Sequence, residues 1–143
     1  MKKLTFLWGI TFLWLFGSCS SPIDYNTSIM NEVEKVEKEV LKITEQQENS
    51  NLEKTQKAFQ EGKKQIKSSL EKLENMSAFR EDDALRQAAI KLVKFYDEFF
   101  TNENQEALDI SAITQKEREV KQNLIDEQYA FIKRYDLIAV AKE

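Results

Sequence analysis

Beyond Pro22 the chain contains one glycine, Gly62, and no further proline, and this scarcity constrains the fold more than any other feature. The tight turns of a many-stranded β fold need residues with special backbone angles, chiefly glycine and proline. Lysine, glutamate, glutamine, asparagine, alanine and leucine dominate instead, and most of these tolerate or favour helix. A length of 143 residues suits one domain. The sequence therefore predicts a single all-α domain.

The first 18 residues have the three-part layout of an export signal. Lys2 and Lys3 form a basic start, residues 4–16 are an almost unbroken apolar run, and two small residues precede Cys19. A helix over that run would rise only about 20 Å, short of the roughly 30 Å hydrocarbon core of a bilayer. We therefore expect residues 1–18 to be a cleaved lipoprotein signal peptide rather than a membrane span.

Cys19 is the only cysteine, and it falls where the signal ends. The stretch Leu15-Phe16-Gly17-Ser18-Cys19 resembles a lipobox, in which the cysteine thiol takes a diacylglycerol; Phe16 stands where leucine is commonest. A free cysteine after an ordinary signal is the alternative. We expect residues 19–22 to be a lipidated tether whose acyl chains, palmitate among them, hold residues 23–143 to a membrane of the bacterial cell envelope. The sequence does not indicate which face of the membrane.

Hydrophobic periodicity predicts two helices in the first half of the domain. The first begins at Ser21 to Asp24, with Pro22 at its first position. The polar stretch 45–51, which contains the capping-box pattern Ser50-x-x-Glu53, predicts a turn, with one continuous helix as the alternative. The second helix is expected over 52–76. Gly62 lies on its apolar face, either as a tolerated glycine, which we favour, or as a point of close helix approach. The expected stripe of the first helix is Ile29, Val33, Val36, Val40 and Ile43.

Two further helices are predicted after a turn over 77–83. The third has a broad apolar face and ends near the polar residues 101–104, and residues 106–110 form a short helical candidate. A second capping-box pattern, Thr114-x-x-Glu117, predicts the start of the fourth helix. Its expected core residues are Val120, Leu124, Phe131, Tyr135 and Ile138, with Ile125 and Ile132 widening the stripe. Short connections make neighbouring helices antiparallel, so we expect an up-down-up-down four-helix bundle.

The amino-acid composition contains few of the residue types that catalysis and metal binding commonly need. The chain has no histidine, which removes the commonest general base and transition-metal ligand. Carboxylates are plentiful, but no sequence motif indicates an enzyme that uses carboxylates alone. Asp24, Glu32 or Asp109 could bind a hard cation, but no cation-binding motif surrounds them. Without Lys2 and Lys3, 19 basic residues face 25 acidic ones, a net charge of −6 that disfavours nucleic acid. We expect a non-enzymatic protein without cofactor or metal.

Four aromatic residues of the third helix, Phe95, Tyr96, Phe99 and Phe100, form the sharpest local feature. They make two pairs spaced four residues apart on neighbouring faces, so the apolar arc is wide. Such clusters are usually core, with one pair inside the bundle and the other under the following connection. The alternative is a groove for a partner helix or an apolar ligand, which Tyr135 would help to line. Further candidate lining residues are Phe79, Tyr129 and Phe131.

The mature chain resembles an uncharacterised family of bacterial surface lipoproteins with a four-helix domain. The segments that carry the resemblance are Tyr25 to Ile29, Phe79 to Ala89, Lys94 to Tyr96 and Phe131 to Tyr135, within about residues 19–137. The resemblance implies a helical bundle at the cell envelope and no catalytic residues. We therefore expect a membrane-tethered module that binds an envelope protein, with a carrier of a small apolar ligand as the alternative.

Overall fold

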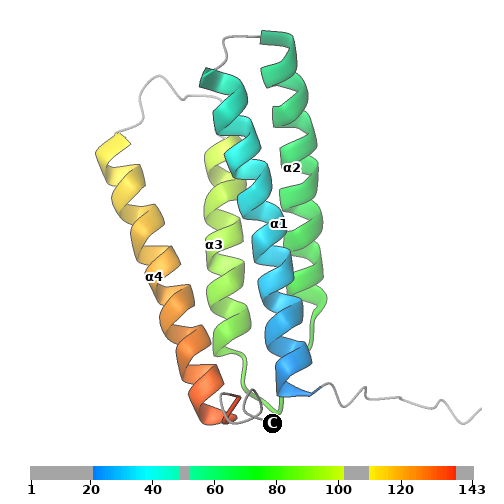
Figure 1. Ribbon diagram of the computed structural model, residues 1–143, viewed down its shortest axis with the longest axis vertical. Coiled ribbons are helices and arrows are strands. Elements are labelled where there is room, and N and C mark those ends of the chain that lie inside the picture. Colours follow the sequence, from blue (N-terminus) through cyan, green and yellow to red (C-terminus); the bar gives the residue numbers. More distant parts are fainter. Residues whose placement is uncertain (1–20, 49–51, 102–109, 138–143) are drawn as a thin grey trace, which may run out of the picture.

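The computed structural model describes residues 21–48, 52–101 and 110–137, and within these ranges the chain is all-helical with no strand. Four helices lie side by side along the long axis of the molecule (Figure 1). This confirms the predicted all-α class and the four helices. The helices are α1 (Pro22–Glu48), α2 (Leu52–Asn75), α3 (Ala84–Thr101) and α4 (Ile110–Arg134).

The start of α1 is a capping box. The backbone N–H of Asp24 donates to the Ser21 hydroxyl at 3.1 Å, and the backbone N–H of Ser21 donates to the Asp24 carboxylate at 3.2 Å. Each side chain thus satisfies a backbone group that the first helical turn leaves without a partner. Pro22 occupies the first helical position, where its missing N–H costs nothing. The predicted start of the first helix is confirmed.

The boundary between α1 and α2 differs from the prediction in one respect. Residues 45–48 were expected in the turn, but they continue α1, because nothing in their sequence prevents a further helical turn. Ser50 of the expected capping box lies outside the described residues. The Thr55 hydroxyl donates to the Gln46 carbonyl at 2.9 Å, so α1 and α2 fold back on each other. The alternative of one continuous helix is wrong.

The turn predicted over 77–83 is present and has a defined geometry. Phe79 and Asp82 exchange two backbone hydrogen bonds, of 3.1 and 2.8 Å, across Arg80 and Glu81, both of which have positive φ. This is the geometry of a type I′ turn, which normally selects asparagine and glycine. Arg86 then donates to the carbonyls of the last turn of α2 and fixes the entry into α3.

The predicted start of the fourth helix is wrong. Helix α4 begins at Ile110, four residues before Thr114, so Thr114 and Glu117 are interior helical residues and form no capping box. Glu117 instead accepts a hydrogen bond from the Tyr96 hydroxyl on α3. The Glu117 side chain, which the pattern assigned to the start of the helix, is therefore bound to a residue of another helix. Of the short helical candidate 106–110, only Ile110 is described, and it belongs to α4.

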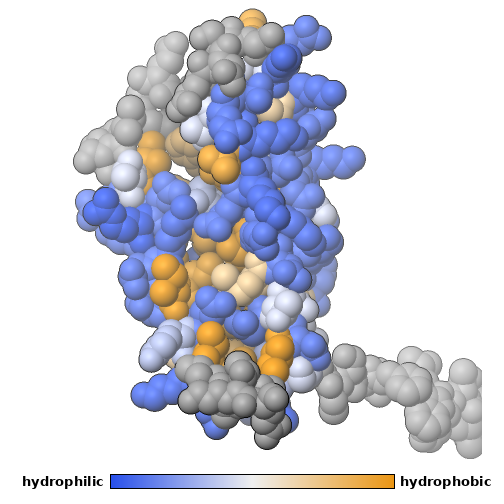
Figure 2. Space-filling model, in the orientation of Figure 1, coloured by the Kyte–Doolittle hydropathy of each residue, from blue (hydrophilic) through white to orange (hydrophobic). Residues whose placement is uncertain are grey.

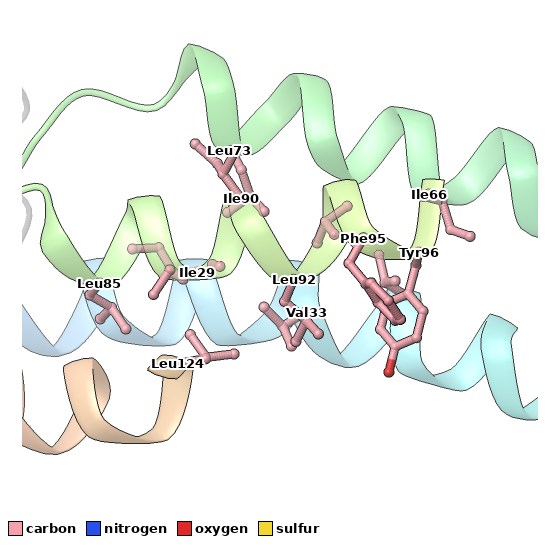
Figure 3. Packing of buried hydrophobic residues seen from close by; sticks show 14 of the residues in the cluster. Ile29, Val33, Ile66, Leu73, Leu85, Ile90, Leu92, Phe95, Tyr96 and Leu124 are labelled. Carbon is pink, nitrogen blue, oxygen red and sulfur yellow. The ribbon is translucent and has the colours of Figure 1, made fainter. Parts of the chain in front are cut away.

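The core lies mainly between α1, α2 and α3, with α4 packed on α3 (Figures 1 and 3). The α1 stripe is buried as predicted except that Val40 is only partly covered. Leu124 and Phe131 of α4 are buried, whereas Ile125 is 57% exposed and does not widen the apolar stripe. Ile138 lies outside the described residues. The fully buried large apolar side chains are Phe131, Ile29, Ile43, Ile66, Leu73, Leu85, Leu92, Val36 and Val93.

A buried polar pair, Glu32 of α1 and Ser69 of α2, lies in the contact between these two helices, which we call the α1–α2 seam. The buried Ser69 hydroxyl donates to the Glu32 carboxylate at 2.8 Å and accepts from Gln65 at 3.0 Å. Lys35 and Lys72 lie 2.6 and 3.5 Å from the same Glu32 carboxylate. The carboxylate is therefore neutralised and hydrogen-bonded, as a mostly buried charge requires.

Candidate functional site

A hollow of about 370 Å³ lies between α1, α3 and the first turns of α4. It forms because α4 packs closely on α3 but leans away from α1 toward its own N-terminus (Figure 1). The polar contacts between α1 and α4 join Lys121 to Glu37 and Gln128 to Asn26, and on α4 both lie farther from its N-terminus than the residues that line the hollow. The residues that line the hollow are Val40, Thr44, Phe95, Tyr96, Phe99, Phe100, Ile113, Thr114 and Glu117.

The wall contributed by α3 consists of packed aromatic rings. Phe95 and Phe99 stack with their centroids 6.4 Å apart, and Phe99 meets Phe100 edge-on at 5.0 Å. Phe95 contacts Tyr96 at 5.4 Å, and Phe100 meets Phe59 of α2 at 5.7 Å. Three of the four α3 rings are buried, and Phe99 is partly exposed. The same residues thus serve the core and the wall of the hollow.

A short polar network closes one side of the hollow. The Tyr96 hydroxyl donates to Glu117 Oε1 at 2.7 Å, and Lys121 Nζ lies 2.9 Å from the same oxygen. The Lys121 ammonium also lies 5.9 Å from the Tyr96 ring centroid, within the range of a cation–π interaction. The hollow is therefore mostly apolar, with one polar edge formed by this network. Figure 3 shows Tyr96 beside Phe95 on α3.

The electrostatics of the network follow from this geometry. Burial and the hydrogen bond to Glu117 raise the pKa of the Tyr96 hydroxyl, so it stays protonated and remains a donor. Burial acts to raise the pKa of Glu117, but hydrogen bonds from Lys121 and Tyr96 outweigh it and lower that pKa. Burial also opposes the charge on Lys121, yet the contact with Glu117 raises its pKa overall. Glu117 and Lys121 therefore stay charged as a pair, and no group here is set up to exchange a proton near neutral pH.

The structure brings together four of the five residues predicted to form a groove. Phe95, Tyr96, Phe99 and Phe100 line the hollow, but Tyr135 does not. Tyr135 packs at the opposite end of the bundle, where its ring meets Phe131 at 4.6 Å. It cannot join the others because it follows the end of α4 and packs on Phe79 in the turn before α3, whereas the four α3 residues lie in the second half of that helix.

Other predicted lining residues also lie elsewhere. Phe79 and Phe131 belong to the cluster around Tyr135, with their ring centroids 5.9 Å apart, and Tyr129 is exposed. The lining residues on α1 and α4 were not assigned to a site from the sequence. Val40 was predicted as a core residue of the first helix, Ile113 was not predicted to have any role, and the pairing of Glu117 with Tyr96 has no local sequence signal.

Two further kinds of feature, a metal centre and a membrane-spanning helix, are absent from the part of the chain that the structure describes. Across 21–48, 52–101 and 110–137, no group of three or more acidic residues is placed to hold a metal ion. In the same part of the chain, no helix combines the length and apolar character of a membrane span. Cys19, the predicted lipidation site, and Asp109 lie outside the described residues. Comparison with family models, with curated proteins and with solved structures gives no match.

Proposed function

We propose that this protein is a lipoprotein of the bacterial cell envelope, anchored by a lipid on Cys19, whose domain is a non-enzymatic binding module for a protein partner. The observation that carries the proposal is the position of the first helix. The α1 capping box starts at Ser21, two residues after Cys19, so the folded domain begins directly where the apolar export signal ends. A stable fold that starts there leaves residues 1–18 free to be removed.

The proposal includes an up-down-up-down arrangement of the four helices. It is supported by contacts that place the end of one helix beside the start of a neighbouring helix. Gln46 contacts Thr55, Phe59 contacts Phe100, and Asp82 forms an ion pair with Arg134 near the end of α4. Each pair joins helices that run in opposite directions.

Labelling with palmitate tests the anchor. Cells that express the full chain are grown with labelled palmitate, and the protein is recovered from the membrane fraction for mass spectrometry. We expect label on the wild type, cleavage before Cys19, and no label on the Cys19→Ser variant. A wild-type protein without label in the cytosolic fraction would overturn the proposal.

Crosslinking in intact membranes tests the binding role. We expect the lipidated protein to be crosslinked repeatedly to the same envelope protein. Leu41 and Leu52 are exposed apolar residues, so a variant with alanine at both positions is the control. Crosslinks that disappear in this variant depend on exposed apolar surface alone. Absence of any recurrent crosslinked protein would contradict the binding role while leaving the anchor intact.

A second function, carriage of a small apolar ligand, is favoured by the hollow. Its volume of about 370 Å³ falls within the usual range for small-molecule sites, and its walls are mostly aromatic and aliphatic. Compounds extracted from the purified full-length protein can be identified by mass spectrometry. We expect an apolar compound with the wild type, its loss from Ile113→Trp, which fills the hollow, and its retention by Ile125→Trp on the exposed face of α4. A wild-type protein that carries no such compound would exclude this function.

A further inference from the structure

The position of the proposed anchor restricts how the domain lies on a membrane. Only Ser20 and Ser21 separate Cys19 from Pro22, where α1 begins. Three residue steps of fully extended chain span at most about 11 Å. The start of α1 lies at the same end of the molecule as the Phe79–Asp82 turn and the end of α4 (Figure 1). We call this the tether end.

The tether end has an aromatic cluster beneath its surface, and exposed apolar or amphipathic side chains lie around that cluster. Tyr25, Phe79 and Phe131 are buried in the cluster and Tyr135 is partly exposed, while the exposed Arg80 guanidinium lies 5.1 Å from the Phe79 ring centroid. Ile23 is exposed beside the tether, and Tyr129 is 65% exposed near the end of α4. Tyrosine rings favour the boundary between water and lipid because one end is apolar and the other polar.

The long walls of the bundle have a different character. Their exposed residues are mostly charged, with Leu41 and Ile125 as apolar exceptions, and form ion pairs such as Lys38 with Glu34, Lys42 with Glu61, and Lys94 with Glu74. In Figure 2 the side of α2 is hydrophilic, whereas hydrophobic residues are visible between α1 and α4. Placing such a wall on a bilayer would remove water from many charged groups at once. The net acidic charge of the domain also disfavours broad contact with anionic lipids.

We propose that the domain stands end-on, with the tether end against the lipid headgroups and the hollow held away from the membrane. This inference rests on the lipid anchor proposed above. Val40 and Thr44, which line the hollow, are 18 and 22 residues along α1 from Pro22, or about 27 and 33 Å at 1.5 Å per residue. The hollow is thus presented to water, where it meets a molecule from the aqueous compartment rather than a lipid of the anchoring bilayer.

Single tryptophans can measure this orientation. Both native tryptophans, Trp8 and Trp14, precede Cys19, so the processed protein contains none. Tyr129→Trp reports the tether end. Leu52→Trp reports the opposite end, since Leu52 begins α2 and is 73% exposed. Arg118→Trp tests side-on contact, because Arg118 is exposed and lies 11 residues before Tyr129, on nearly the same face of α4 and about 16 Å farther from the tether end.

The lipidated variants are inserted into vesicles of phosphatidylethanolamine and phosphatidylglycerol that contain lipids with a nitroxide on the headgroup. We expect the fluorescence of Tyr129→Trp to fall at least twofold, while that of Leu52→Trp and Arg118→Trp stays within a tenth of its value without nitroxide. Quenching of Arg118→Trp together with Tyr129→Trp would show that the bundle lies on α4 and would overturn the proposal.

Two other outcomes also overturn the proposal. Quenching of Leu52→Trp would place the opposite end on the lipid, and no quenching of Tyr129→Trp in a palmitate-labelled protein would show that the tether end does not touch the bilayer. In both cases the anchor itself would stand, since the palmitate label measures it separately. Loss of the label from the wild type would remove both the anchor and the orientation.

Discussion

The Cδ1 atom of Ile43 occupies the space in which Gly62 would carry a side chain. A Cβ built on Gly62 would lie 2.5 Å from Ile43 Cδ1 and 3.3 Å from Ile43 Cγ1. Ile43 is fully buried, so its side chain has little room to move aside. Gly62 therefore lets α1 and α2 approach closely, and the interpretation of Gly62 as a merely tolerated glycine is wrong.

This contact predicts the behaviour of Gly62→Ala. Alanine gains about 1 kcal/mol of helix propensity, but overpacking a core typically costs about 1–3 kcal/mol. We expect Gly62→Ala to lower the free energy of unfolding by about 1 kcal/mol, measured by urea denaturation. Ile43→Val removes the Cδ1 atom, so we expect Gly62→Ala to be better tolerated in that background, with a coupling of at least about 0.5 kcal/mol. Gln60→Ala, on the exposed face of α2, is the control. A rise in stability from Gly62→Ala alone would contradict the prediction.

The Glu32–Ser69 hydrogen bond predicts a pH dependence. Burial acts to raise the pKa of Glu32, but hydrogen bonds from Lys35 and Ser69 outweigh it, so that pKa is lower in the folded protein. The contribution of Glu32 to stability is then present above its ordinary pKa of about 4.5 and is lost as the pH falls through the lowered folded value. We expect the stability gap between the wild type and Glu32→Gln to be largest near pH 7 and to shrink below pH 4.5. A gap that widens on acidification would show that the pKa is raised instead.

Ser69→Ala tests the same seam at neutral pH. Removing the hydroxyl leaves the Glu32 carboxylate with one donor fewer in a buried place, which should cost about 1–3 kcal/mol. Ser68→Ala, one position along the same helix and partly exposed, is the control and should change the free energy of unfolding by less than about 0.5 kcal/mol. Equal effects of the two changes in urea denaturation would show that the hydrogen bond contributes nothing specific.

The aromatic cluster at the tether end predicts a large effect of Phe131→Ala. The Phe131 ring is fully buried and contacts Tyr25, Phe79 and Tyr135 at centroid distances of 4.6–5.9 Å. Its removal should cost about 3–5 kcal/mol by leaving a cavity between α1, α4 and the turn. Tyr129→Ala, two residues away but exposed, should cost less than about 0.5 kcal/mol. Thermal denaturation followed by circular dichroism separates the two, and similar midpoints would refute this account of the cluster.

The positive φ angles in the turn between Phe79 and Asp82 predict that a substitution at Glu81 stabilises the protein. The Glu81 φ of 70° is costly for a residue with a side chain, and glycine adopts that angle freely. We expect Glu81→Gly to raise the free energy of unfolding by up to about 1 kcal/mol. Glu71→Gly, in the exposed interior of α2, should lower it by about the same amount. If both glycines destabilise the protein equally, Glu81 makes a contact that outweighs its backbone cost.

The sequence by itself determined the helices, because each is encoded locally. The α1 stripe, the Ser21 cap, and the polar turn before α3 depend on residues within a few positions of one another, and these predictions hold. The start of α4 was predicted wrongly because the spacing of Thr114 and Glu117 also fits the interior of a helix, where Glu117 accepts a hydrogen bond from Tyr96 of α3. A local pattern has no information about a distant partner.

Only the tertiary structure decided which faces meet. It placed Tyr135 away from the aromatic residues of α3, it made Gly62 a close-approach point, and it opened the hollow by tilting α4 away from α1. These features depend on side-chain volumes and helix directions summed over several helices. Periodicity tells which side of a helix is apolar, but the packing of the whole bundle decides what that side touches.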